Sequence, residues 1–121
     1  MERIAEGEYA VMEVLWEESP LTAAEVAERV PEDRGWSLAT VKTMLSRLLA
    51  KGALAHEEDG RRYLYRPAIA REDYVAEESG RLIDRMFGGR VTPLVAQLAE
   101  RDRLSEADIA EIEALLKALK A

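Results

Sequence analysis

The sequence predicts a mostly helical protein with one small β-hairpin. Apolar residues recur at helical spacing through most of the 121 residues. Residues 53–66 instead alternate with a period of two around a glycine turn, which is typical of paired strands. Ser, Thr, Pro and Gly residues stand where helices are expected to begin and end. Together these patterns indicate three helices, a hairpin and three further helices.

Two helices are expected before residue 35. Residues 8–18 combine an apolar face with an acidic side, and Ser19-Pro20 ends that helix. Thr22 and Glu25 have the spacing of a capping box, so a second, short helix is expected to start at Thr22. Pro31 ends it, and residues 32–35 are expected to form a loop.

A third helix is expected over residues 38–51, with Ser37 as its N-cap and Gly52 just beyond its end. Trp36, before the cap, is expected to pack onto this helix, with base stacking as the alternative. The spacing of the apolar residues predicts one buried face. The residues expected to turn inward are Leu38, Val41, Leu45 and Leu48.

The hairpin is expected directly after the third helix. Residues 53–56 form its first strand, residues 57–60 its turn and residues 61–66 its second strand, which Pro67 closes. Three helices followed by a hairpin is the element order of a winged helix-turn-helix. Residues 1–69 are therefore expected to form a winged-helix DNA-binding domain.

Residues 70–121 are expected to form an α-helical dimerisation domain. Its helices are predicted at residues 71–87, at 93–103 with Thr92 as cap, and from a cap at Ser105 to about residue 120. Three helices of this size rarely bury enough surface to be stable alone, so pairing with a second copy is expected. The alternative is that they fold back on the first domain. The residues expected in the dimer interface are Leu82, Met86, Leu94, Leu98, Ile109, Ile112, Leu116 and Leu119.

Charge is distributed unevenly along the chain. The whole sequence has 17 basic and 24 acidic residues, for a formal charge of −7. By itself this acidity argues against binding nucleic acid or an anionic membrane. Residues 36–66, however, hold six basic and three acidic residues, a local charge of +3. A polyanion is steered by the local electric field and not by the net charge of the whole protein, so this segment is a candidate contact for DNA. The alternative is that the local excess of basic residues arises by chance.

The third helix is the candidate reading helix, because its outward face has small hydroxyls and cations but no carboxylate. Such a face fits the major groove, where Thr reaches bases and Lys or Arg reaches phosphate or guanine. The alternatives are an ordinary solvated face or a winged helix that binds protein instead of DNA. The residues expected to contact DNA are Thr40, Lys42, Thr43, Ser46, Arg47 and Lys51 from the helix, with Arg61, Arg62 and Tyr63 from the hairpin.

Other chemistries find little support in the sequence. The absence of cysteine excludes disulfides and thiolate metal sites, and a reducing cytoplasm is the simplest compartment. The single histidine, His56, is expected to be an ordinary surface residue and not a metal ligand. We expect no catalytic residues, no metal, no cofactor and no direct membrane binding.

The residues also resemble the signature of the penicillinase-repressor family of the BlaI/MecI type. The resemblance covers nearly the whole chain. Its strongest part is the segment Trp36-Ser37-x-x-Thr40-Val41-x-Thr43-x-Leu45-x-Arg47-Leu48-x-x-Lys51-Gly52. Val11-Met12-x-Val14-Leu15-Trp16 upstream, Gly60-Arg61-x-Tyr63-x-Tyr65-x-Pro67 in the hairpin and Phe87-Gly88-Gly89 further on fit the family as well.

The resemblance implies a repressor that binds a two-fold symmetric operator through paired winged helices, with its C-terminal helices forming the homodimer. In that family, the signal of a membrane sensor leads to cleavage in the C-terminal domain and relieves repression. The positions that match the family's cleaved Asn-Phe dipeptide are Gln97 and Leu98, which makes this different dipeptide the candidate cleavage position. The copper-responsive branch carries a C-terminal cysteine cluster, which this chain lacks.

Overall fold

The computed structural model describes residues 3–121 and divides the chain into two compact units, with the boundary between Tyr74 and Val75. The first unit contains three helices and a hairpin, and the second contains helices. This confirms the predicted mostly helical class with a single hairpin.

The first unit begins with the three predicted helices. They are α1 (Glu6–Glu17), α2 (Ala23–Arg29) and α3 (Leu38–Ala50), with a short 3-10 turn, η1 (Glu32–Arg34), in the segment expected to be a loop. The capping box of α2 is present: the Thr22 hydroxyl accepts from the Glu25 amide, and the Glu25 carboxylate accepts from the Thr22 amide. The Ser37 hydroxyl accepts from the Thr40 amide and caps α3.

The core of this unit lies where α1, α2 and α3 meet. Gly7 lets α1 approach α3 closely, because an added Cβ there would lie 3.1 Å from Cε of Met44. Trp36 packs against this core, as expected. The fully buried side chains of the core are Val11, Met12, Leu15, Val26, Val41, Leu45 and Leu48.

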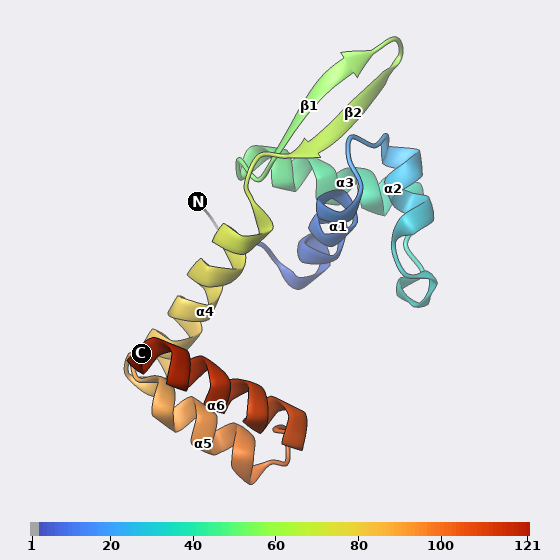
Figure 1. Ribbon diagram of the computed structural model, residues 1–121. Helices are drawn as coiled ribbons and strands as arrows, with labels where there is room; N and C mark the ends of the chain where they lie inside the picture. The colour runs from blue at the N-terminus through green and yellow to red at the C-terminus, as the bar shows by residue number, and fades with distance from the viewer. Residues whose placement is uncertain (1–2) are drawn as a thin grey trace. The chain divides into compact units, whose positions relative to one another are not determined.

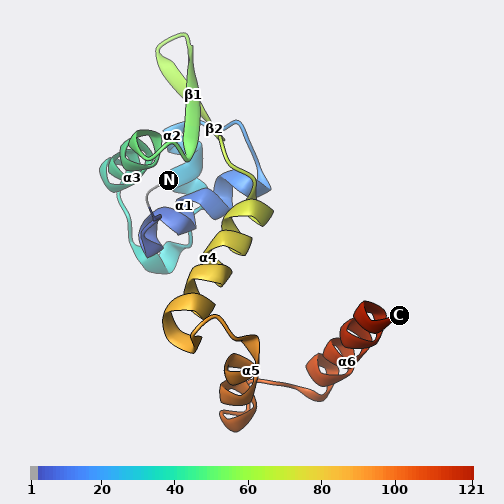
Figure 2. The ribbon, with the colours of Figure 1, turned by 90° about the vertical axis from the view of Figure 1, so that its left-hand side faces the viewer.

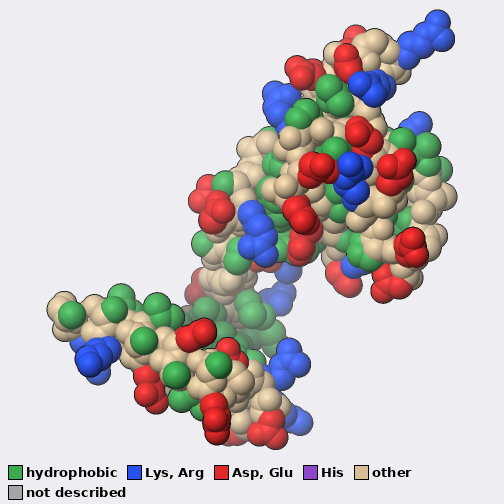
Figure 3. Space-filling model, turned by 45° about the vertical axis from the view of Figure 1, so that its right-hand side comes forward, with side chains coloured by type: hydrophobic (Ala, Val, Ile, Leu, Met, Phe, Trp, Pro, Cys, Tyr) green, Lys and Arg blue, Asp and Glu red, His purple; other side chains and the backbone are tan. Residues whose placement is uncertain are grey.

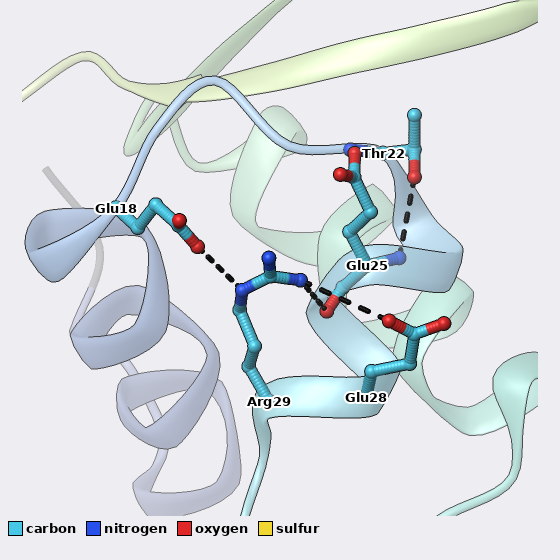
Figure 4. Close-up of polar contacts among 5 residues, drawn as sticks. All are labelled: Glu18, Thr22, Glu25, Glu28 and Arg29. Carbon is cyan, nitrogen blue, oxygen red and sulfur yellow. Dashed lines mark hydrogen bonds and ion pairs between the residues drawn. The ribbon is translucent and has the colours of Figure 1, made fainter.

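An ion-pair bridge joins the end of α1 to α2 (Figure 4). The Arg29 guanidinium contacts the Glu18 carboxylate, lies 4.0 Å from that of Glu28, and donates to the carbonyl of Glu25 at 3.0 Å. These groups are partly exposed, so each pair adds little to stability. The positive charge of Arg29 is therefore paired with carboxylates on the side of the unit formed by α1 and α2.

The hairpin extends away from the helices of its unit (Figure 1). Strands β1 (Leu54–Asp59) and β2 (Arg62–Pro67) are antiparallel, with Asp59 opposite Arg62. The expected turn at residues 57–60 is therefore wrong in its bounds. Only two residues connect the strands, and Gly60 has a φ of 66°, so the first strand continues to Asp59.

An aromatic cluster joins the start of α4 (Arg71–Phe87) to α1. The Trp16 indole donates to the Ile69 carbonyl at 2.9 Å, and its ring lies 6.0 Å from that of Tyr74. Tyr9 contacts both rings. Because Tyr74 is buried there, the first turn of α4 belongs to the first unit, and the unit boundary falls inside this helix.

The second unit comprises the rest of α4, α5 (Val91–Glu100) and α6 (Glu106–Lys120). The predicted bounds of α4 and the Ser105 cap of α6 are confirmed. The predicted start of α5 is wrong: Arg90, not Thr92, is its N-cap. Pro93 is tolerated inside the first turn, since amides there have no partner within the helix. The predicted end at residue 103 is also too late, because Asp102 adopts a left-handed φ of 54°.

No residue of the second unit is buried. In Figure 2, α5 and α6 lie apart from each other. Among the described residues, no helix is both long and apolar enough to cross a lipid bilayer. The large apolar side chains that remain exposed are Leu82, Met86, Val91, Val95, Ile109, Leu115, Leu116 and Leu119.

Leu38 differs from its expected position. The sequence predicts that it turns inward, but its side chain is 42% exposed. It is the first residue of α3 and lies beside the start of α2 and the hairpin, whereas Leu45 in the middle of the helix is fully buried.

Leu45→Ala should therefore cost far more stability than Leu38→Ala. The first substitution leaves a cavity in the core and should lower the free energy of unfolding by about 2–5 kcal/mol. The second removes a half-exposed side chain and should cost about 1 kcal/mol or less. Urea denaturation of the two variants measures both values, and equal losses would contradict this assignment of the core.

Candidate nucleic-acid interface

The exposed face of α3 is the one that the sequence predicts. With Val41, Leu45 and Leu48 buried, Lys42, Thr43, Ser46 and Arg47 remain exposed and Thr40 is partly exposed. The Thr43 hydroxyl donates to the Ala39 carbonyl at 3.1 Å, and the Thr40 hydroxyl lies 3.1 Å from that of Ser37. The face is therefore formed by small hydroxyls and cations.

Among the described residues, no ion pair holds the cations of this face. Within residues 3–121, neither Lys42 nor Arg47 forms an ion pair, and α3 itself contains no Asp or Glu. Elsewhere in the same unit acidic side chains are frequent. Figure 3 shows many red acidic groups over the helical body, interspersed with blue basic groups, and a blue basic group at the outer end of the hairpin. An unpaired cation on an exposed helix is available to a phosphate oxygen without first breaking a bond.

A groove of about 350 Å³ connects α3 to the hairpin. It brings together four of the predicted contact residues, Lys42, Arg61, Arg62 and Tyr63. Leu38, Tyr65 and the first residues of α2 complete it, and sequence reasoning missed them. The capping box at Thr22 was the available signal, because it fixes where α2 begins. The lining residues are Thr22, Ala23, Ala24, Leu38, Lys42, Arg61, Arg62, Tyr63 and Tyr65.

Two side chains of the hairpin have acidic neighbours. Arg62 donates twice to the Asp59 carboxylate, at 3.0 and 2.9 Å, and the Tyr63 hydroxyl donates to Glu58 at 3.4 Å. Both pairs are exposed, so water and a phosphate compete with them easily. Arg61 makes no ion pair among the described residues and lies at the turn of the hairpin.

His56 lies in an aromatic row on the hairpin. Its ring is 4.7 Å from that of Tyr63 and stacks on Tyr65 at 5.7 Å. The residues from 3 to 121 include no group of three His, Asp or Glu side chains able to hold a metal ion. The imidazole therefore has a packing role between two tyrosines.

Lys51 differs from the other predicted contacts of α3, because its cation is bound by the protein itself. Its ammonium donates to the carbonyl of Arg3 at 2.8 Å and to the Glu8 carboxylate at 2.5 Å, and its side chain is only 17% exposed. Whereas Lys42 belongs to the groove at the start of α3, Lys51 caps the other end of the helix and is bound to α1.

The Glu8 carboxyl group remains ionised at a lower pH than an ordinary glutamate, because its pKa is lowered. Burial alone would raise its pKa, but hydrogen bonds from Lys51 and the Ala5 amide, with the charges of Lys51 and Arg47, lower the pKa below the usual 4.5. The folded chain therefore stabilises the ionised form of Glu8 more than the unfolded chain does.

Glu8→Gln should reduce the sensitivity of folding to acid. Because the folded-state pKa is lowered, the ionised Glu8 stabilises the fold above about pH 4.5, and this contribution is lost as the pH falls through the folded-state pKa. The difference in free energy of unfolding between wild type and variant should be largest near neutral pH and shrink below pH 4.5. Urea denaturation at several pH values measures it, and a difference independent of pH would contradict the assignment.

The helical order, the hairpin and the acid-free face of α3 define a winged-helix protein of the DNA-binding class. Known proteins match this description. The family model described as Penicillinase repressor covers residues 4–118. The penicillinase repressor of Bacillus licheniformis is 35% identical over 115 residues, which cover 95% of this chain and 90% of that protein. The chain therefore belongs to the penicillinase repressor family.

Further comparisons agree with this family. The methicillin resistance regulatory protein MecI of Mammaliicoccus sciuri is 26% identical over 93% of this chain and 92% of its own. The solution structure of the DNA-binding domain of the repressor BlaI matches 61% of this chain and 94% of that chain, with 39% identity and a TM-score of 0.53. Bacillus licheniformis BlaI in complex with the blaP half-operator matches 60% of this chain and 89% of its own, at 40% identity and a TM-score of 0.52.

Proposed function

We propose that this chain is a cytoplasmic transcriptional repressor that binds a two-fold symmetric DNA operator as a homodimer. The observation that carries the proposal is the exposed face of α3, which holds unpaired cations and hydroxyls but no carboxylate in an otherwise acidic protein. The likeness to BlaI, whose monomeric form has been solved in complex with a half-operator, supports the DNA-binding part of the proposal. Each protomer would place α3 in the major groove of one half-site.

The proposed contacts fall into two groups. Thr40, Thr43 and Ser46 reach base edges, where a methyl or hydroxyl group of small size allows close approach. The cations position the protein on the phosphate backbone. Lys42 and Arg47 do so from α3, while Arg61 and Arg62, with Tyr63, do so from the hairpin across the groove.

Fluorescence anisotropy with labelled duplexes from the DNA upstream of the gene tests the proposal. We expect one duplex that contains an inverted repeat to bind far more tightly than the others at physiological salt. Binding with no dependence on sequence would contradict it. Such a result would favour a winged helix that contacts a protein partner.

Lys42→Ala should weaken binding to all duplexes and reduce the dependence of affinity on salt. If the Lys42 ammonium contacts phosphate, the slope of log K against log salt falls by about one per protomer. Lys120→Ala, which removes the same charge from the last turn of α6, should leave the slope unchanged. An unchanged slope in the Lys42 variant would remove this residue from the phosphate contacts.

The second unit supports the homodimer. It has no buried residue, and Leu82, Met86, Ile109, Leu116 and Leu119 of the proposed interface are exposed in the single chain. An apolar surface of this extent is unfavourable in water unless a second chain covers it. Leu94, Leu98 and Ile112 are partly buried, and they would complete the same interface.

Ile112→Asp should convert the dimer into a monomer. The substitution places a charge in the middle of the proposed helical contact, where it would be buried without a partner. Sedimentation velocity should show a single chain at concentrations where the wild type and a Glu111→Ala control are dimers. An intact dimer of the variant would show that the contact lies elsewhere.

Control by a membrane sensor protease is the remaining part of the proposal, and it rests on the family resemblance. Gln97 and Leu98, the candidate cleavage position, lie within α5. A protease would need to unwind this helix to reach them as an extended segment. Because no residue of α5 is buried in the single chain, little packing inside the chain opposes that unwinding.

A further inference from the structure

Glu8 is a buried carboxylate at the point where α1 meets the end of α3. Glu8 is only 2% exposed. It lies in the first turn of α1, and its Oε1 accepts from the Ala5 amide at 3.1 Å and from the Lys51 ammonium. Removing a carboxylate from water is costly, and its partners must compensate for the loss. Lys51 is the only cation that forms an ion pair with it among the described residues.

The same contact controls where the Lys51 ammonium lies. Glu8 Oε1 and the Arg3 carbonyl take two of its three N–H donors, and its side chain is 17% exposed. Lys42, on the same helix, is exposed and unpaired. Two lysines of one helix therefore have different roles: one is available to DNA, and the other is bound to the protein.

We propose that Glu8 is a positioning residue that limits non-specific DNA binding: through Lys51 it fixes the end of α3 and withholds the Lys51 cation from the DNA backbone. The inference rests on the proposed function and departs from the expectation that Lys51 contacts DNA. Each phosphate contact raises affinity for every sequence, so a cation that is withheld lowers the affinity for non-specific DNA and leaves the base contacts unchanged. Glu8 thus keeps the sequence-independent part of the affinity low.

The test compares Glu8→Gln, Lys51→Met and the double variant in the full-length protein, by measuring anisotropy against salt on a non-specific duplex and on the preferred one. In Glu8→Gln the Lys51 ammonium loses its anionic partner. We expect the salt slope on the non-specific duplex to steepen by about one per protomer. The affinity for the non-specific duplex should rise by about 3-fold or more at physiological salt.

Lys51→Met should leave the salt slope unchanged, because the wild-type ammonium contacts no phosphate. The double variant should return to the wild-type slope and non-specific affinity, which would show that the effect of Glu8 passes through Lys51. The double variant also contains no unpaired buried charge, so it remains informative if Lys51→Met does not fold. Glu13→Gln removes the same charge from an exposed position of α1. This variant therefore controls for the general change in protein charge.

A decrease of about one in the slope of Lys51→Met, or of the double variant, would overturn the proposal by showing that Lys51 contacts phosphate. An unchanged slope in Glu8→Gln, or an equal effect of Glu13→Gln, would overturn it as well. Failure of the proposed function looks different, because the wild type would then show no sequence preference on any duplex.

Discussion

The packing of α3 against α1 and α2 is the constraint on which the DNA-binding surface depends. Val41, Leu45 and Leu48 are fully buried together with Met12 and Leu15, so the rotation of α3 about its axis is set by the core. A helix that rotated to expose these residues would lose several kcal/mol of apolar burial. The hydroxyls and cations on the opposite side are therefore presented to solvent by the same packing that stabilises the fold.

Much of this arrangement follows from the sequence, because its signals are local. The Thr22, Ser37 and Ser105 caps and the buried spacing of Val41, Leu45 and Leu48 depend on residues only three or four positions apart, and the structure has them. The errors occur where local rules permit two answers. A proline fits either the first or the third position of a helix, so Pro93 left the start of α5 undetermined.

The roles of charged side chains were harder to predict, because they depend on contacts between distant residues. Lys42 and Lys51 look alike in the sequence, and both are predicted to contact DNA. They differ only because Glu8, 43 positions before Lys51, is buried beside one of them. The groove between α3 and the hairpin has the same origin. It joins residues 22–24 with residues 61–65, and no periodicity relates these two segments.

The acidity of the chain is compatible with DNA binding because most of it lies away from α3. The chain holds ten carboxylates before residue 36 and none between Trp36 and His56. Several of the first group are occupied: Glu18 and Glu28 pair with Arg29, and Glu8 pairs with Lys51. The remainder repel a phosphate backbone that approaches from any other side. On the proposed function, a duplex would therefore be attracted where α3 and the hairpin are exposed. Because one such surface is small, two copies held together by the second unit would bind DNA far more strongly than one, since the second contact forms at a high effective concentration.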